Sequence, residues 1–155
     1  MAASSLDQTD KALLRLLQDN ANLTTKELSE KLHLSPTPVY ERQKRLEKEG
    51  YIEKYVAVLN KEKLGKKLIV FCNVKLKQHE RGMGEKFVNA INNMPDVMEC
   101  YNISGEYDFM LKILVEDMPQ YQDFIMNKLT LIENIGSTHS MFVMGEIKRS
   151  LAYTI

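Results

Sequence analysis

Two strong helix start signals lie close together near the N-terminus of this chain. Thr24 followed by Glu27 forms a capping box, in which each side chain bonds the backbone N–H of the other residue. The helix that starts there is short, because its apolar positions end at Leu32. Ser35 is a favoured N-cap and Pro36 suits a first helical position, so a second helix follows a three-residue turn. Two helices joined in this way form a helix-turn-helix.

The helix that begins at Pro36 is predicted to run to about Glu49, with Gly50 closing it in a left-handed conformation. His33 stands in the turn, where a left-handed backbone is also expected. A further helix is predicted over residues 7–19, capped by Asp7 or Asp10, with its apolar stripe made by Leu13, Leu14, Leu16 and Leu17.

The predicted helix over 36–49 differs in chemistry between its two sides. Val39 and Leu46 mark the buried side, with Gln43 near the same seam. The other side is rich in cations, as a helix in the major groove requires, because Arg and Lys bond guanine edges and phosphates. A solvated charged face is the alternative, since acidic residues are interspersed. The residues expected to bind DNA are Ser35, Thr37, Pro38, Glu41, Arg42, Lys44, Arg45, Lys48 and Lys54.

Different members of this set are expected to play different parts. The base edges are expected to meet Thr37, Pro38 and Arg42 or Arg45. The phosphates are expected to meet Lys44, Lys48 and Lys54. Phosphate contacts release counterions, so the affinity should fall as salt rises.

Residues 51–59 alternate apolar and polar side chains and then become largely apolar, which predicts a strand. The charged stretch after it suits a linker better than a core. The predicted domains are therefore a helix-turn-helix domain over 1–60, a linker over 61–67 and a second domain over 68–155.

Strand and helix patterns alternate in the second domain. One helical pattern is stopped by Pro95 and another is opened by Pro119. The order β-α-β-β-α-β is typical of a ferredoxin-like domain, a four-stranded antiparallel sheet with two helices on one face. The chain is thus predicted to be α+β, with strands over 68–76, 97–104, 109–115 and 138–147 and helices over 82–93 and from 119.

The predicted strands are apolar on both faces, as in Val70 beside Phe71 and Phe109 beside Met110. Two helices cover only one face of such a sheet, and soluble monomers avoid large exposed apolar patches. We therefore expect the uncovered faces of two copies to pack together, so that the chain is at least a homodimer.

The composition excludes several classes of protein. No apolar run approaches the ~18 residues that a membrane span requires, and the start lacks the pattern of a secretory signal. Cys72 and Cys100 lie in apolar runs, which indicates buried free thiols in a cytoplasmic protein. Residues 1–67 carry 13 basic and 10 acidic side chains, whereas residues 68–155 carry 8 and 11, so the two halves are suited to different partners.

The sequence offers little for catalysis or metal binding. Its histidines, His33, His79 and His139, lie outside metal-ligand spacing of one another and of the cysteines. It contains no glycine-rich phosphate loop, G-x-S-x-G or H-E-x-x-H motif. We therefore expect no enzyme activity, no cofactor and no metal.

Three stretches together form a recognisable pattern: Leu34-Ser35-Pro36-Thr37-Pro38-Val39, then Arg45-Leu46-Glu47 with Gly50, then Ser104-Gly105-Glu106-Tyr107-Asp108-Phe109. Their order and spacing resemble those of the Lrp/AsnC regulators. The resemblance implies a winged-helix-type domain that binds double-stranded DNA and a C-terminal domain that binds small molecules, usually amino acids. It also implies dimers that associate into octamers or similar rings. His33, where glycine is common, and Gln43, where an aliphatic residue is common, depart from the family pattern.

The siroheme decarboxylases are similar to this family and offer an enzymatic alternative. They share the two-domain plan and place histidines near a tetrapyrrole. His139, in the last predicted strand, is the candidate for that role here.

A free amino acid presents an ammonium and a carboxylate, and both need partners when they leave water. The turn of Gly105, Glu106, Tyr107 and Asp108 can offer backbone N–H groups to the carboxylate, and Asp108 can accept from the ammonium. Thr138 and Ser140 add hydroxyl groups, and the resemblance implies an effector site at this turn. An ordinary hairpin turn is the alternative. Leucine or methionine is the effector that the resemblance favours.

Overall fold

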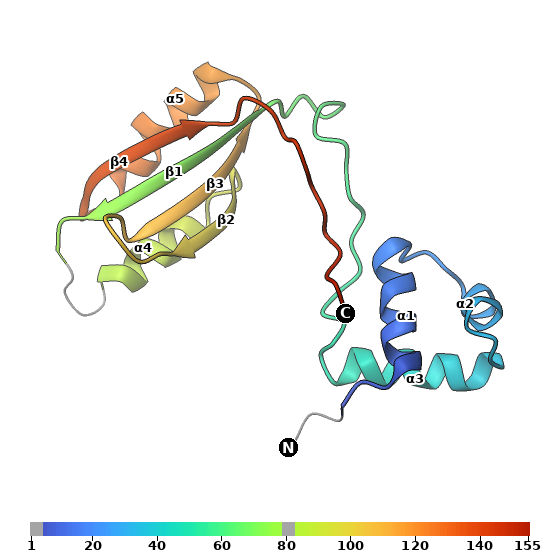
Figure 1. Ribbon diagram of the computed structural model, residues 1–155. Helices are drawn as coiled ribbons and strands as arrows, with labels where there is room; N and C mark the ends of the chain where they lie inside the picture. Colours follow the sequence, from blue (N-terminus) through green and yellow to red (C-terminus); the bar gives the residue numbers. More distant parts are fainter. Residues whose placement is uncertain (1–4, 79–82) are drawn as a thin grey trace. The chain divides into compact units, whose positions relative to one another are not determined.

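The structure is a computed structural model that describes residues 5–78 and 83–155 and divides into two compact units (Figure 1). The N-terminal unit contains the chain up to Val58 and also Ile147–Ile155, and the C-terminal unit is Leu59–Glu146. The predicted domains placed residues 147–155 in the second domain by their position in the sequence. In the structure these residues pack with the N-terminal unit, a contact that the sequence does not reveal. The α+β class is confirmed, with helices in the first unit and a sheet with helices in the second.

The first helix, α1 (Gln8–Asp19), begins at a capping box that uses both candidate aspartates. Asp7 is the N-cap and its Oδ1 accepts from the Asp10 backbone N–H at 2.7 Å. Asp10 Oδ2 accepts from the Asp7 backbone N–H at 3.1 Å. The two carboxylates therefore bond the start of the helix reciprocally.

The predicted helix-turn-helix is present as α2 (Thr25–Leu32) and α3 (Pro36–Lys48). The capping box at the start of α2 is formed, and His33 adopts the expected left-handed backbone, with φ 54° and ψ 42°. Gly50 closes α3 with φ +80°. Ser35 is the N-cap of α3 but makes no side-chain capping bond, so this helix start rests on the preset backbone of Pro36.

The three helices enclose a small apolar core. Leu13, Leu28, Val39 and Leu46 are completely buried, so each helix contributes at least one leucine or valine to the centre. Val39 and Leu46 are the two residues of α3 that were expected on its buried side, and their burial confirms the predicted orientation of that helix.

The predicted strand over 51–59 is wrong, since residues 52–60 form no regular secondary structure. The Leu46 carbonyl accepts from the N–H groups of Tyr51 and Ile52, at 3.0 and 3.3 Å. Beyond them no strand in the described part of the chain supplies ladder hydrogen bonds. An alternating pattern needs such a partner to become a strand.

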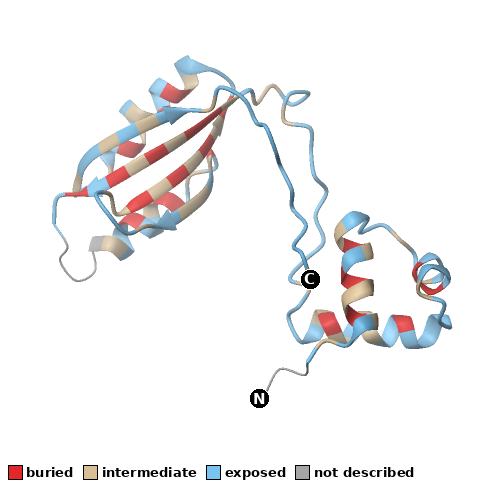
Figure 2. Ribbon diagram, in the orientation of Figure 1, coloured by how far each residue is buried: buried red, intermediate tan, exposed pale blue. Residues whose placement is uncertain are grey.

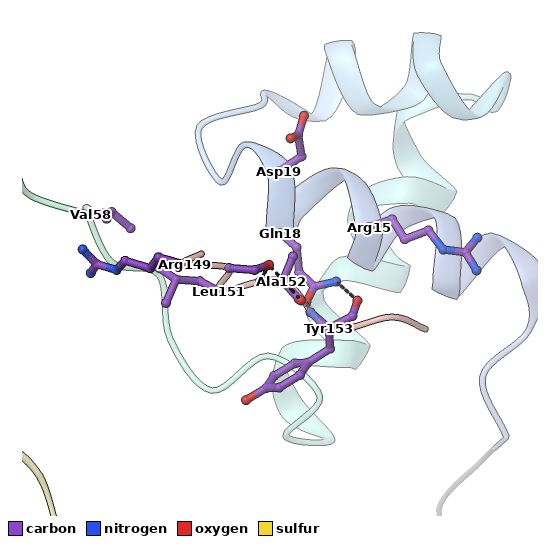
Figure 3. Close-up of a pocket in the computed structure, with 9 residues that line it drawn as sticks. Arg15, Gln18, Asp19, Val58, Arg149, Leu151, Ala152 and Tyr153 are labelled. Atoms are coloured by element: carbon purple, nitrogen blue, oxygen red, sulfur yellow. Dashed lines mark hydrogen bonds between the residues drawn. The ribbon is translucent and has the colours of Figure 1, made fainter. Parts of the chain in front are cut away.

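A C-terminal segment, Ile147–Ile155, completes the N-terminal unit (Figure 3). Gln18 Nε2 donates to the Tyr153 carbonyl at 3.2 Å, and the Tyr153 N–H donates to Gln18 Oε1 at 2.6 Å. Arg15 Nε donates to the Ile155 carbonyl at 2.8 Å. The Ile155 side chain packs against the helical core, so this segment is bound to α1 by both polar and apolar contacts.

Removal of residues 151–155 is expected to destabilise the N-terminal unit by about 1–2 kcal/mol, because the bonds to Arg15 and Gln18 are lost. Thermal unfolding followed by circular dichroism would show the first transition at lower temperature and the transition of the C-terminal unit unchanged. Lys148→Ala, at an exposed position of the same segment, is the matched control. An unchanged first transition in the shortened chain would contradict the expectation.

The C-terminal unit contains a four-stranded antiparallel sheet in the order β2 (Val97–Asn102), β3 (Phe109–Val115), β1 (Leu68–Leu76) and β4 (Ile135–Phe142), which is the predicted ferredoxin-like arrangement (Figure 1). Its helices lie against one face of the sheet. The predicted helix over 82–93 begins at Met83 in the structure, and Gly82 lies outside the described residues. The elements are β1 (Leu68–Leu76), α4 (Met83–Asn92), β2 (Val97–Asn102), β3 (Phe109–Val115), α5 (Met118–Asn127), a short 3-10 helix η1 (Leu129–Leu131) and β4 (Ile135–Phe142).

The last strand ends earlier than predicted, at Phe142 instead of residue 147. Phe142 pairs with Val70 of β1, and Val143 adds one backbone bond to Ile69 at 3.0 Å. Since β1 begins at Leu68, the chain beyond Val143 runs past the end of its neighbour and leaves the sheet.

The face of the sheet that the helices do not cover is only partly apolar. We call it the open face, and it carries Ile69, Phe71, Met110, Leu114, Met141 and Tyr101 beside the polar residues Asn73, Glu99, Lys112 and His139. Figure 2 shows burial alternating along most of β1 and all of β3, because their buried residues other than Ile69 point to the helices and the residues between them to the open face. The prediction of strands apolar on both faces was therefore too strong.

Candidate DNA-binding and effector sites

The exposed face of α3 holds most of the residues expected to bind DNA. A helix places residues three and four apart side by side, so the spacing of this set gathers it on one side of α3. Lys54 is also exposed, in the irregular segment after the helix. The exposed residues of the predicted set on α3 and its N-cap are Ser35, Thr37, Pro38, Glu41, Lys44 and Lys48.

Tyr40 belongs to this face and was missed in the sequence. Its side chain is 52% exposed, and Lys44 Nζ lies 5.8 Å from the centre of its ring. This distance fits a cation–π contact between a lysine and a tyrosine one helical turn apart. The spacing of four residues was the signal that could have revealed the pair.

Arg42 and Arg45 differ from the other cations of α3, because both bond to the start of α1. Arg42 Nη1 lies 2.6 Å from Asp7 Oδ2 and 2.8 Å from Asp10 Oδ1. Arg45 Nη2 lies 2.5 Å from Asp10 Oδ1. The side-chain bonds to Asp7 and Asp10 raise the pKa of Arg42 above its ordinary value, so the guanidinium stays charged.

Gln43 takes part in a hydrogen-bond network between α3 and the segment after it. Its Nε2 donates to the Tyr55 hydroxyl at 2.9 Å, and that hydroxyl donates to Glu47 Oε1 at 2.9 Å. Lys44 Nζ donates to Glu47 Oε2 at 2.6 Å, which lowers the pKa of the Glu47 carboxyl and raises that of the Lys44 ammonium. Gln43 thus fixes Tyr55 beside the helix, where an aliphatic residue could not.

In the C-terminal unit, the turn of residues 105–108 joins β2 to β3 and is held against the end of β1. Gly105 has φ +117°, which strongly favours glycine at this position. Asp108 Oδ2 accepts from the Leu76 N–H at 2.7 Å, and the Asp108 N–H donates to the Val74 carbonyl at 2.9 Å. The Asp108 carboxylate thus bonds the backbone of β1.

Thr138 and Ser140, the two residues of β4 in the predicted effector set, occupy different environments. Thr138 pairs with Val74, the residue whose carbonyl bonds Asp108, so Thr138 lies one strand away from the turn. Ser140 Oγ instead lies 2.5 Å from the Tyr121 hydroxyl of α5. Burial raises the pKa of Tyr121 to about 12, so its hydroxyl stays protonated in this contact. The structure places Thr138 near the turn and engages Ser140 with α5.

Tyr107, His139 and Gly136 also shape this end of the sheet. The ring of Tyr107, in the turn, stacks on His139 of β4 with centres 6.2 Å apart. A Cβ at Gly136 would lie 3.2 Å from the Lys75 carbonyl oxygen, so glycine lets β4 approach the irregular end of β1 closely. Glu106, the remaining residue of the predicted effector set, is exposed on the turn.

The described parts of the chain contain no cluster of three or more His, Cys, Asp or Glu side chains that could hold a metal ion. Likewise, none of the helices within residues 5–78 and 83–155 has the length and apolarity to cross a membrane. His79, one of the three histidines considered above, lies outside the described residues.

A helix-turn-helix with a cationic exposed face, followed by a ferredoxin-like unit, defines a two-domain DNA-binding regulator. Residues 6–53 match the family model for winged helix-turn-helix DNA-binding domains. Residues 69–153 match the model for the Lrp/AsnC ligand-binding domain, which covers more than half of the chain. The chain belongs to the Lrp/AsnC family and is a transcriptional regulator with a DNA-binding and a ligand-binding domain.

Similar proteins support this membership over almost the whole length of the chain. The transcriptional regulator AzlB of Bacillus subtilis is 36% identical over 150 residues, covering 97% of this chain and 96% of that protein. The leucine-responsive regulatory protein of Escherichia coli is 35% identical over 145 residues, covering 94% and 88%. A transcriptional regulator of Neisseria meningitidis, solved as a complex with L-methionine, superposes with a TM-score of 0.93 at 33% identity, covering 97% of both chains.

Proposed function

We propose that this regulator inserts α3 into the major groove of double-stranded DNA. The observation that carries the proposal is the exposed face of α3, on which a threonine and two lysines follow one another at helical spacing. Thr37, Pro38 and Tyr40 would meet base edges near the start of the helix. Lys44, Lys48 and Lys54 would meet phosphates, and Ser35 and Glu41 would border the contact.

The effector proposed for the C-terminal unit is an apolar amino acid, with methionine first and leucine second. The methionine complex of the Neisseria relative and the leucine-responsive relatives support this choice. The turn of residues 105–108 would bind the amino acid, because Gly105 leaves the backbone accessible and Asp108 supplies a carboxylate for the ammonium. Thr138 would contribute a hydroxyl from the neighbouring end of β4, and Ser140 is less suited because Tyr121 engages it.

The assembly proposed is a dimer through the open face, with dimers joining into an octamer or similar ring. Ile69, Phe71 and Leu114 give this face an apolar centre. Asn73 Oδ1 on the same face is buried without a hydrogen-bond partner among the described residues. A second copy would cover the apolar side chains and could supply a donor to Asn73.

We assign the chain to the cytoplasm, where a bacterial regulator of the kind found among its relatives meets DNA. We also assign it no enzymatic role. His139, which the siroheme decarboxylase alternative requires, stacks on Tyr107. The tetrapyrrole alternative does not explain the cationic face of α3.

A titration of DNA by the full chain tests this function. The DNA directly upstream of its own gene would be compared with a scrambled fragment at two salt concentrations, with and without L-methionine or L-leucine. We expect tighter binding to the upstream fragment, weaker binding to both at higher salt, and a change on adding amino acid. Absence of binding to either fragment at low salt would contradict the proposal.

A further inference from the structure

Asp10 stands out in the N-terminal unit as a buried charge at the contact of two helices. The residue is only 1% exposed, yet it lies in the first turn of an α-helix and carries a carboxylate. Its Oδ2 accepts from the Asp7 backbone, and its Oδ1 receives both Arg42 and Arg45 from α3. A carboxylate buried this deeply requires such partners, because its loss of hydration is otherwise uncompensated.

These bonds hold each arginine on one side, while the side chains of Arg42 and Arg45 stay 31% and 40% exposed. Arg42 Nη1 is shared between Asp7 and Asp10, at 2.6 and 2.8 Å. Arg45 Nε is buried without a hydrogen-bond partner among the described residues, so this side of its guanidinium does not face solvent. To contact DNA through Nη2, Arg45 would have to break its bond to Asp10. The buried Asp10 carboxylate would then lose one of its partners.

We infer that Asp10 is a positioning residue for DNA recognition, which holds Arg42 and Arg45 against α1 and thereby fixes the angle at which α3 presents Thr37, Tyr40 and Lys44. This inference rests on the proposed function. Under it the two arginines neither read bases nor neutralise phosphates. They join α3 to α1, and the lysines of α3 make the phosphate contacts that depend on salt.

The dependence of DNA binding on salt separates the two kinds of cation. Each phosphate that a protein neutralises contributes about 0.9 to the slope of log K against log salt concentration. Lys48→Met is therefore expected to reduce the slope on a scrambled duplex by about 0.9. Arg45→Met is expected to leave that slope unchanged and to reduce the preference for the upstream fragment over the scrambled one by about tenfold. Asp10→Asn is expected to reduce the same preference and to steepen the slope, because the arginines are then released toward the DNA.

Each alternative gives a different result with the full chain. A slope reduced by Arg45→Met as much as by Lys48→Met would overturn the inference, because Arg45 would then contact phosphate. A lower melting temperature of Arg45→Met with an unchanged preference would also overturn it, since the role would be structural only. If Asp10→Asn does not fold, the inference is tested by Arg45→Met and Arg42→Met alone. Both should reduce the preference for the upstream fragment without changing the salt slope. Salt-independent or absent binding by the unmodified chain would instead refute the proposed function itself, and the inference with it.

Discussion

Replacement of Leu46 by alanine is expected to unfold most of the N-terminal unit near 37 °C while the C-terminal unit remains folded. The Leu46 side chain is completely buried in the helical core, and its carbonyl receives the N–H groups of Tyr51 and Ile52. A buried Leu→Ala change costs about 2–5 kcal/mol, and a unit of this size has a stability of similar magnitude. DNA binding should be lost together with the first thermal transition.

Calorimetry of the full chain would measure both transitions in one experiment. Lys48→Ala is the matched control, because it lies on the same helix with an exposed side chain and should leave the melting temperature unchanged. A single transition that shifts for the whole chain in Leu46→Ala would show that the two units unfold together, contrary to this prediction.

Replacement of Asp108 by asparagine is expected to abolish the response to amino acid and to leave DNA binding intact. The Asn side chain keeps an oxygen that can accept from the Leu76 N–H, so the turn should stay attached to β1. It lacks the negative charge that the ammonium of the effector requires. Loss of a charge-assisted hydrogen bond of about 1.5–3 kcal/mol corresponds to a decrease in affinity of roughly tenfold to a hundredfold.

Isothermal titration with L-methionine and with L-leucine would measure this loss directly. Glu85→Gln removes a carboxylate at an exposed position of α4, outside the proposed effector site, and should bind as the unmodified chain does. If Asp108→Asn also binds normally while Asp108→Ala loses thermal stability, Asp108 serves only to attach the turn to β1.

The sequence predicted the helix-turn-helix closely because the signals for it are local. The capping box of Thr24 and Glu27 and the left-handed His33 act within a few residues, and both are present in the structure. The order of strands and helices along the second unit, predicted from their patterns, was likewise confirmed. The strand predicted over 51–59 failed because a strand needs hydrogen bonds from a neighbour, and residues 52–60 have none in a sheet.

The candidate sites were less predictable than the fold. The pattern of α3 placed Arg45 with the cations of its exposed side, and it could not show the bond of Arg45 to Asp10, 35 residues earlier in the chain. Gln43 could not be assigned, and its partner proved to be Tyr55, 12 residues later. Tyr40 was overlooked, although its spacing from Lys44 was visible.

By itself, then, the sequence determined where the helices begin and end, which side of each is apolar, and the family to which the chain belongs. Caps, spacing and turn residues act over a few positions, and so they can be read along the chain. Only the tertiary structure showed that Arg42 and Arg45 bond Asp10 and that the segment ending at Ile155 contacts α1, because Arg42 and Asp10 are separated by 32 positions and Arg15 and Ile155 by 140. The bonding of these charges depends on burial and on neighbours that the folded chain alone brings together.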